Sequence, residues 1–463
     1  GDAIGACLYS SKVPVSITGG LFVGVLGDGA SAGTVYKVKP SEGCVVRESP
    51  FEDKDAYPYA VAAPAGDFMV TGGAQGVDYS YGSNVLELRT GTPMVVSMKA
   101  PGSTTSTDRI AVSASGKAAN VTLEGVGIEL SGEKDCAFEI RSGATANVTL
   151  AEGSDNLLVS GASRAGLEVA GEASVTIGGE GSLTAKCFGK ADAYGAGIGG
   201  GANDAAGSIK ITGGTVTASC KSAGEGKTAF GAGIGGGLNG SAGSVRISGG
   251  EVVASSKGAD AKGAGIGGGD GVGGEVSISG GTVIASCENT QGDALGAGIG
   301  GGSGGSDVNV SISGGTVDAS CESTQRDARG AGIGGGDSAG GNVSISGGTV
   351  TASCRNVQGD IRGAGIGGGF CGSGGNVSIS GGRISVVGEG GGIGNGGHYE
   401  GDPVDVSITG GLFGDGKVDG NTVYGVTPAA GCLVLASSAA DIAAGYPYAV
   451  TGLAGDFKVD GGE

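Results

Sequence analysis

The sequence predicts an all-β protein that folds as a single-stranded, right-handed parallel β-helix of about ten coils, each of 27–36 residues, with a small β module at each end. Three recurring phrases support this prediction. They are the heptapeptide GAGIGGG, a Val-polar-Ile/Leu phrase such as NVSISGG, and a segment such as TVTASC. The heptapeptide begins at Gly195, Gly231, Gly263, Gly296, Gly330 and Gly363, and a degraded copy begins at Gly391.

Each unit therefore has three short segments of alternating apolar and polar residues, joined by glycine-rich turns. Such a unit cannot bury its apolar face alone, but it can do so when stacked on copies of itself. At about 4.8 Å per coil, ten coils give a rod of roughly 50 Å. Two inward columns are expected. They are Val121, Val148, Val175, Ile209, Val245, Val276, Val310, Val343, Val377 and Val406, and Ile198, Ile234, Ile266, Ile299, Ile333, Ile366 and Ile393.

The third segment predicts a column of buried thiols. In TVTASC, Val216, Ala218 and Cys220 share one face, because alternate residues of a strand point to the same side. Five cysteines occupy this position in successive units, and Ser256 fills it once: Cys187, Cys220, Cys287, Cys321 and Cys354. Cβ atoms on neighbouring coils would be nearly 5 Å apart, beyond the ~3.5–4.5 Å of a disulfide. Free stacked thiols are therefore expected.

The glycine phrase also contains G-x-G-x-x-G, the spacing of a dinucleotide-binding turn. That turn needs a helix directly after it to direct N–H groups at pyrophosphate. Here turn sequence follows instead, GANDAAG after the first copy. We interpret the glycines as a corner that needs positive φ and close approach of another chain segment. No cofactor is predicted.

The two ends of the chain carry copies of one module. VSITGGLF begins at both Val15 and Val406, and AGDF begins at both Ala65 and Ala454. We assign residues 1–75 to an end module that is the tail of a preceding β-helix, 78–403 to the solenoid, and 404–463 to an end or capping module homologous to 13–73. Further tandem β-helix domains of the same polypeptide are expected.

Composition excludes several classes of partner. The net charge is −19 and the acidic residues are scattered, which argues against nucleic acid and anionic membrane surfaces. No apolar run approaches the ~18 residues of a membrane span.

A column of acidic residues precedes the glycine phrase by three positions: Asp192, Thr228, Asp260, Asp293, Asp327 and Asp360. Stacked carboxylates repel by about 1 kcal/mol in water and by more at lower dielectric. Lys262, Arg329 and Arg362 can offset part of this. A bound Ca²⁺ can supply the rest, or each Asp can bond the backbone N–H groups of its own turn, the simpler interpretation.

Several other residues are candidate ligand-binding or catalytic groups. Lys210 and Arg246 are expected side by side on neighbouring coils, where they would hold an anionic sugar or form a solvated patch. The aromatic residues beside the glycine corner, Tyr194, Phe230 and Phe370, would suit sugar stacking. The phrases with Tyr57, Tyr59, Tyr446 and Tyr448 are expected to cap open coil ends. The single histidine, His398, has no evident catalytic partner, so no catalytic residue is predicted.

These phrases resemble secreted, multi-repeat β-helix proteins of anaerobic, mostly Gram-positive bacteria. The resemblance rests on ANVTLEGVGIEL, the alternation of GAGIGGG with VSISGGTVTA, and the closing GGLF…VY…YPYAV. It implies an extracellular location on a bacterial cell surface and a glycan or host macromolecule as partner, but no catalytic residue. Three functions stay open: a non-catalytic, adhesin-like surface rod, a carbohydrate-binding module for acidic polysaccharide, and a pectate-lyase-like enzyme that degrades polysaccharide.

Overall fold

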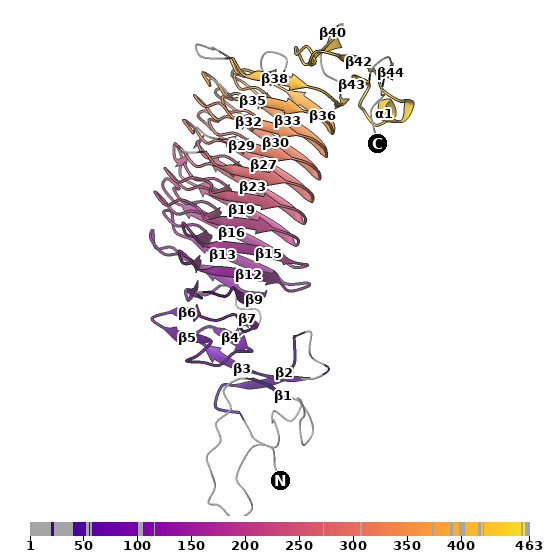
Figure 1. Ribbon diagram of the computed structural model, residues 1–463. Helices are drawn as coiled ribbons and strands as arrows, with labels where there is room; N and C mark the ends of the chain where they lie inside the picture. The colour runs from indigo at the N-terminus through magenta and orange to yellow at the C-terminus, as the bar shows by residue number, and fades with distance from the viewer. Residues whose placement is uncertain are drawn as a thin grey trace, which may run out of the picture.

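The computed structural model is a column of stacked parallel coils with a β module at each end (Figure 1). It describes residues 20–22, 40–51, 55, 58–100, 105–114, 116–271, 273–305, 308–372, 375–388, 392–397, 403–414, 418–419, 421–454 and 457–458. Each coil passes through three parallel sheets in turn, which we call sheets 1, 2 and 3. The predicted parallel β-solenoid is therefore confirmed.

Sheet 1 contains the Val-polar-Ile phrases. Its parallel strands are β7 (Met94–Met98), β9 (Ala119–Glu124), β12 (Thr145–Leu150), β15 (Ser174–Gly179), β18 (Ser208–Ile211), β22 (Ser244–Ile247), β26 (Glu275–Ile278), β29 (Asn309–Ile312), β32 (Asn342–Ile345), β35 (Asn376–Ile379) and β38 (Asp405–Ile408). Exposed and buried residues alternate along these strands, as in Asn342–Ile345. The polar residues thus face solvent and the valines and isoleucines face the core.

Sheet 2 contains the TVTASC segments. Its parallel strands are β10 (Gly127–Glu129), β13 (Asp155–Ser160), β16 (Ser182–Gly189), β19 (Thr215–Ser222), β23 (Glu251–Gly258), β27 (Thr282–Asn289), β30 (Thr316–Ser323), β33 (Thr349–Asn356), β36 (Arg383–Val387) and β39 (Gly411–Phe413). Among the described residues these are ten strands, one per coil. Sheets 1 and 3 each have one parallel strand more, so the coil number is close to that expected.

Sheet 3 contains the glycine phrases. Its parallel strands are β6 (Val85–Leu88), β8 (Arg109–Val112), β11 (Phe138–Ile140), β14 (Leu167–Val169), β17 (Ile198–Gly199), β21 (Ile234–Gly235), β25 (Ile266–Gly267), β28 (Ile299–Gly300), β31 (Ile333–Gly334), β34 (Ile366–Gly367) and β37 (Ile393–Gly394). The hairpin partner of β6, strand β5 (Tyr79–Gly82), ends this sheet. Two short strands, β20 (Thr228–Ala229) and β24 (Asp260–Ala261), pair with each other and contact strands of sheet 2.

The interior is one continuous apolar core that runs through the coils. The isoleucines of sheet 3 pair directly from coil to coil, for example Ile198 with Ile234 and Ile234 with Ile266, and each is fully buried. Burying such a side chain stabilises the fold by about 1.5–3 kcal/mol. The predicted isoleucine column is confirmed from Ile198 to Ile393.

The predicted valine column is wrong at one step, between Val148 and Val175, whereas Val121 pairs with Val148 as expected. Val175 pairs with Ala146, whereas Val148 pairs with Ile177. From Val175 to Val406 the column is as expected. The shift is two residues, and the side-chain period of a strand is two, so the same faces still point inward.

The glycine phrase is explained by two close approaches. A Cβ on Gly233 would lie 2.4 Å from the backbone nitrogen of Ser255, in the sheet 2 strand of the next coil. Gly235 has φ +129°, and its Cβ would lie 2.1 Å from the carbonyl oxygen of Gly267 on the next coil. The backbone segments therefore lie too close together at this corner for a residue with a side chain.

The ends of the solenoid carry the remaining strands. The N-terminal module comprises β1 (Gly20–Phe22), β2 (Val45–Glu48), β3 (Tyr59–Ala65) and β4 (Phe68–Thr71). The C-terminal module begins with the last strand of sheet 2, β39, and adds β40 (Val418–Asp419), β41 (Thr422–Val423), β42 (Cys432–Ala436), β43 (Tyr448–Ala454) and β44 (Phe457–Lys458). In the described part of the chain, the single helix is α1 (Ala439–Ala443), and no helix is long and apolar enough to cross a membrane.

Candidate functional site

Three columns of side chains line the corner between sheets 2 and 3, and together we call them the corner surface. The first is the aspartate column of the sequence analysis, and the second precedes the glycine phrase: Tyr194, Phe230, Lys262, Leu295, Arg329 and Arg362. The third follows the phrase: Ala202, Leu238, Asp270, Ser303, Asp337 and Phe370. Their side chains are half-buried, except for the exposed Asp360.

Backbone hydrogen bonds bring the second and third columns together. The N–H of Asp270 donates to the carbonyl oxygen of Phe230 on the preceding coil, at 2.9 Å, and that of Asp337 donates to Leu295 at 2.7 Å. The same bond joins Phe370 to Arg329, at 2.7 Å. Residues eight positions apart in the repeat are therefore neighbours across coils.

The aspartates are hydrogen-bonded from one coil to the next. Oδ1 of Asp260 accepts from the N–H of Asp293 at 2.9 Å, and Oδ1 of Asp293 accepts from the N–H of Asp327 at 3.0 Å. Asp327 bonds the N–H of Asp360 in the same way, and Asp192 bonds that of Thr228. The expectation that each Asp bonds its own turn is therefore wrong. The N–H groups that follow Asp293 in its own turn, those of Ala294 and Leu295, already donate to carbonyl oxygens of neighbouring coils.

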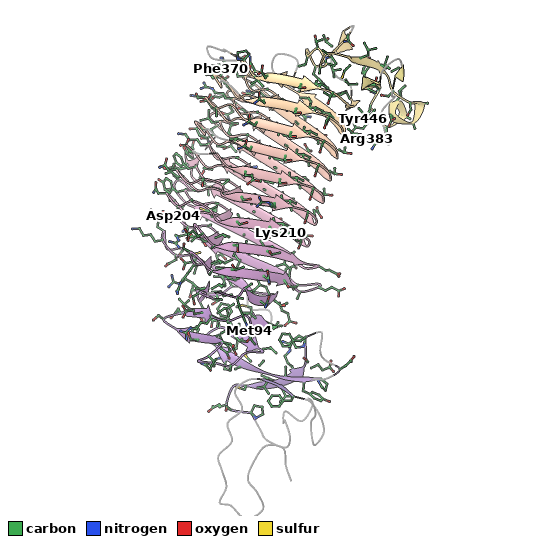
Figure 2. The ribbon with its side chains drawn as sticks, in the orientation of Figure 1. Met94, Asp204, Lys210, Phe370, Arg383 and Tyr446 are labelled. Carbon is green, nitrogen blue, oxygen red and sulfur yellow. The ribbon has the colours of Figure 1, made fainter. Side chains whose placement is uncertain are left out.

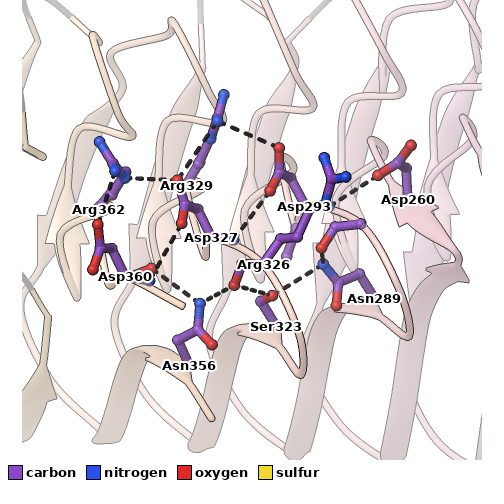
Figure 3. A network of polar contacts seen from close by, with 12 residues as sticks. Asp260, Asn289, Asp293, Ser323, Arg326, Asp327, Arg329, Asn356, Asp360 and Arg362 are labelled. Carbon is purple, nitrogen blue, oxygen red and sulfur yellow. Dashed lines mark hydrogen bonds and ion pairs between the residues drawn. The ribbon is translucent and has the colours of Figure 1, made fainter. Parts of the chain in front are cut away.

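Two arginines alternate with these carboxylates (Figure 3). Arg329 lies 3.4 Å from Oδ2 of Asp293 and 3.6 Å from Oδ2 of Asp327. Arg362 lies 2.7 Å from Oδ2 of Asp327 and 2.8 Å from that of Asp360. Each guanidinium thus bridges the aspartates of two coils, which offsets their repulsion as predicted.

Lys262 does not share this role. Its ammonium group lies 3.4 Å from Asp270, in the third column, rather than beside Asp260. It also lies over the ring of Phe230, 5.1 Å from the centroid. The expectation that Lys262 offsets the aspartate column is therefore wrong, because its side chain turns toward the other flank of the glycine phrase.

The aromatic residues of the corner surface are already in contact with neighbours. The rings of Tyr194 and Phe230 are stacked, with centroids 5.3 Å apart and planes 15° apart. Phe370 lies between Arg329 and Arg362, whose guanidinium carbons are 5.2 and 5.1 Å from its centroid. Cation–π contacts of this kind contribute about 0.5–1 kcal/mol each when exposed. Tyr194 is the first residue of the second column.

Asp337 is a member of the site that the sequence analysis missed. Burial raises the pKa of its carboxyl, although Arg329 acts in the opposite direction. Its Oδ1 is buried without a hydrogen-bond partner among the described residues. The available signal was the recurrence of Asp270 and Asp337 directly after the glycine phrase.

The aspartate column does not show the geometry of a metal site. Nowhere in the described ranges do three or more His, Cys, Asp or Glu side chains form a group that could hold a metal ion. Asp260, Asp293 and Asp327 each use one carboxylate oxygen for the next coil. These oxygens are therefore engaged in stacking the coils.

The cysteine column lies beneath the loop that joins each sheet 2 strand to the glycine phrase, beside the main core. The thiols are free, and the predicted register is confirmed, with Ser256 between Cys220 and Cys287. Each side chain donates to a carbonyl oxygen of the preceding coil, such as Cys321 to Ala294 at 3.4 Å and Ser256 to Gly231 at 2.9 Å. They pack with a column of buried alanines in two satellite clusters. These thiols therefore hold the loop against the coil.

Lys210 and Arg246 are side by side in sheet 1, as predicted, and both are exposed (Lys210 is labelled in Figure 2). Arg246 lies 3.2 Å from Glu275 on the next coil and contacts Ser244. An exposed pair of this kind contributes about 0–1 kcal/mol. Lys210 is thus the more available of the two cations.

The remaining candidates lie at the chain ends. Tyr59 is in β3 and Tyr448 is in β43, where Tyr448 packs against the core. Tyr446, which is labelled in Figure 2, is half-buried. Tyr57 and His398 lie outside the described residues.

A buried ion pair in the earlier coils was also missed. Glu168 of β14 is 2 % exposed and lies 2.6 Å from Arg164. Arg164 also pairs with Glu139 of the preceding coil, at 3.1 Å. Burial raises the pKa of Glu168 to about 7, against the opposing effect of Arg164. These coils lack the glycine phrase, so no repeat position pointed to the pair.

Five segments of the chain match the beta helix repeat family: 209–238, 245–270, 276–303, 310–337 and 343–370. Each begins in a sheet 1 strand, passes through sheet 2 and the corner, and ends in the third column of the corner surface. The chain is a multi-repeat β-helix protein. One family repeat is therefore one coil of this β-helix protein. No curated protein and no solved structure matches the chain.

Proposed function

We propose that this β-helix protein is a non-catalytic, extracellular rod that presents an adhesin-like module on a bacterial surface. The proposal rests on one observation: the charged side chains of the corner surface bond neighbouring coils to one another. Its carboxylates accept N–H groups of the next coil, and its arginines bridge two coils each. The charged groups that recur in the repeat thus serve to extend the stack, as a rod requires.

The repeat makes rod length adjustable by whole coils. Glu275, Asn309, Asn342 and Asn376 occupy the same position in successive strands of sheet 1. Deleting residues 275–375 therefore removes three coils and restores the register. The variant should fold and be shorter by about 14 Å, at the strand spacing. Small-angle scattering measures the length, and failure to fold while a matched one-coil deletion of 275–308 does fold would contradict coil-by-coil extension.

Function is tested on a glycan array, with and without calcium, and by incubation with pectin. A folded sample that binds no glycan and turns over no polymer supports the rod. Turnover of pectin by that sample would overturn the non-catalytic proposal and favour the pectate-lyase-like alternative.

A second experiment compares the full-length chain and the three-coil deletion, each displayed on a cell surface. It measures whether adhesion to host cells depends on the length of the rod.

A carbohydrate-binding module for acidic polysaccharide is the second candidate. Lys210 favours it, since its exposed ammonium group adjoins Arg246 on an outward face. The stacked rings of Tyr194 and Phe230 offer an aromatic surface at the corner. Binding that is lost in Lys210→Ala but kept in Lys221→Ala, an exposed lysine of sheet 2, would favour this candidate over the rod.

A further inference from the structure

The two end modules are built by the same strand pairing. In the N-terminal module β1 pairs antiparallel with β3, with Phe22 opposite Tyr59. In the C-terminal module β39 pairs antiparallel with β43, with Phe413 opposite Tyr448. The next strands correspond as well, because β2 lies along β3 as β42 lies along β43. The hairpins β3–β4 and β43–β44 pair Ala65 with Phe68 and Ala454 with Phe457.

The long strand of each module has two shorter strands along the same edge. Strand β3 pairs with β1 through residues 59–61 and with β4 through residues 62–65. Strand β43 pairs with β39 through 448–450 and with β44 through 453–454. The long strand therefore joins two shorter strands end to end.

In each module, one of the two shorter strands also pairs with a strand of the solenoid, and it is a different one in the two modules. In the C-terminal module β39 is also the last parallel strand of sheet 2, paired with β36. In the N-terminal module β4 pairs antiparallel with β7, the strand on which sheet 1 begins. One short strand thus belongs to the solenoid before the module, and the other starts the solenoid after it.

From this correspondence we infer that the module is a splint between two β-solenoids. In its C-terminal copy, strand β44 pairs with the first sheet 1 strand of another solenoid. That solenoid begins in the same way as the one that starts at β5 and β7 in this chain. The inference deepens the proposed rod function and rests on it, because a splint of this kind lets rods be joined end to end. Figure 1 shows the two modules at opposite ends of the column.

The N-terminal copy shows the contacts that such a seat requires. The N–H of Asp67 donates to Oδ2 of Asp108 at 2.8 Å, and Ser106 Oγ donates to Oδ2 of Asp67 at 2.6 Å. The Tyr81 hydroxyl donates to the same oxygen of Asp108, at 2.8 Å. Gly66 has φ +66°, and a Cβ there would lie 2.1 Å from Oδ2 of Asp108. The turn of the hairpin thus fits closely against the first coil.

The phrase AGDF that makes this turn recurs at 454–457, although residues 455 and 456 lie outside the described part of the chain. The receiving residues, Tyr81, Ser106 and Asp108, belong to the solenoid start and not to the module. The C-terminal turn therefore carries the same sequence as the turn that is seated here. One contact differs, since Arg47 pairs with Glu124 at 3.1 Å and its counterpart is Leu435.

The test is a tandem protein in which Glu463, the counterpart of Ala74, is followed directly by a second copy starting at Gln75. Hydrogen exchange is measured for the amides of 457–460 in the single and tandem proteins. We expect these amides to exchange at least about tenfold more slowly in the tandem protein, because they become part of a sheet. Gly455→Ala should abolish the slowing. The matched control, Gly452→Ala in the same module, should keep it, since a Cβ there meets nothing within 4 Å and alanine already occupies the corresponding position, Ala63.

The folding of the second copy is monitored by the protection of its own isoleucine column. Unchanged exchange at 457–460 next to a folded second copy would overturn the inference, as would full protection in Gly455→Ala. No ligand enters this assay. Binding or turnover on glycans can therefore refute the proposed function while this result stands, and the reverse also holds.

Discussion

Oδ1 of Asp293 accepts the backbone N–H of Asp327 on the next coil at 3.0 Å, while Oδ2 of Asp293 lies 3.4 Å from the guanidinium of Arg329. One carboxylate thus serves two coils. The like charges of Asp293 and Asp327, which would repel on their own, are held together because each gives one oxygen to the backbone and another to an interleaved arginine.

Asp293→Ala should therefore lower the free energy of unfolding by about 1–3 kcal/mol, because it leaves a half-buried N–H and a guanidinium with fewer partners. The amide of Asp327 should also exchange faster. Urea unfolding and hydrogen exchange measure the two effects. The control Asp318→Ala, at an exposed position of β30, should change stability by less than about 0.5 kcal/mol. Equal effects of the two variants would show that the ladder contributes nothing.

Gly233→Ala should destabilise the solenoid by about 3 kcal/mol or more, because the new methyl would lie 2.4 Å from a backbone nitrogen. The backbone of sheet 2 cannot move aside without disturbing neighbouring coils. Gly82→Ala is the control, since a Cβ there meets nothing within 4 Å. Thermal unfolding of both variants decides, and a tolerated Gly233→Ala would mean that the corner is not tightly packed.

The sequence was most informative where the repeat is regular. A strict period placed Ile198 over Ile234 and Cys287 over Cys321 correctly. It could not decide whether an Asp bonds its own turn or the next one, since both patterns repeat with the same period. The predicted pairing of Val148 with Val175 was wrong because the turn between sheets 1 and 2 is two residues shorter in the later coil. No apolar pattern marks the length of a turn.

The ion pair of Glu168 and Arg164 was beyond such reasoning for a related reason. These residues lie four apart in the chain, and a charged residue in a strand is expected to face solvent. Only the packing of Gly201, whose Cβ would lie 3.2 Å from Glu168, shows that the next coil covers this carboxylate. Burial by a neighbouring coil is a tertiary property with no local signal.

The cysteine column should resist alkylation in the folded protein. Hydrogen bonding to Cys287 and Cys354, together with burial, raises the pKa of Cys321 far above its usual range. At pH 8 iodoacetamide should modify the exposed Cys371 within minutes and leave Cys321 and its column unmodified until the chain is unfolded. Mass spectrometry of tryptic peptides reads both populations, and native labelling of Cys321 would show that the loop opens. Cys321→Ser should cost little, because Ser256 already donates to a carbonyl at the same position.

Glu168 should make stability fall as the pH rises from about 4.5 to 7. Its pKa is about 7 in the folded protein and near 4.5 when unfolded, so the folded state binds the proton more tightly. The stabilisation is fully present below pH 4.5 and is lost as the pH passes 7, with a slope of up to about 1.4 kcal/mol per pH unit. Glu168→Gln removes this titration, so the difference in unfolding free energy between variant and wild type should shift in favour of the variant as the pH rises. Urea unfolding at several pH values measures the difference, and a difference that stays constant from pH 4.5 to 7 would mean that Arg164 keeps Glu168 ionised throughout.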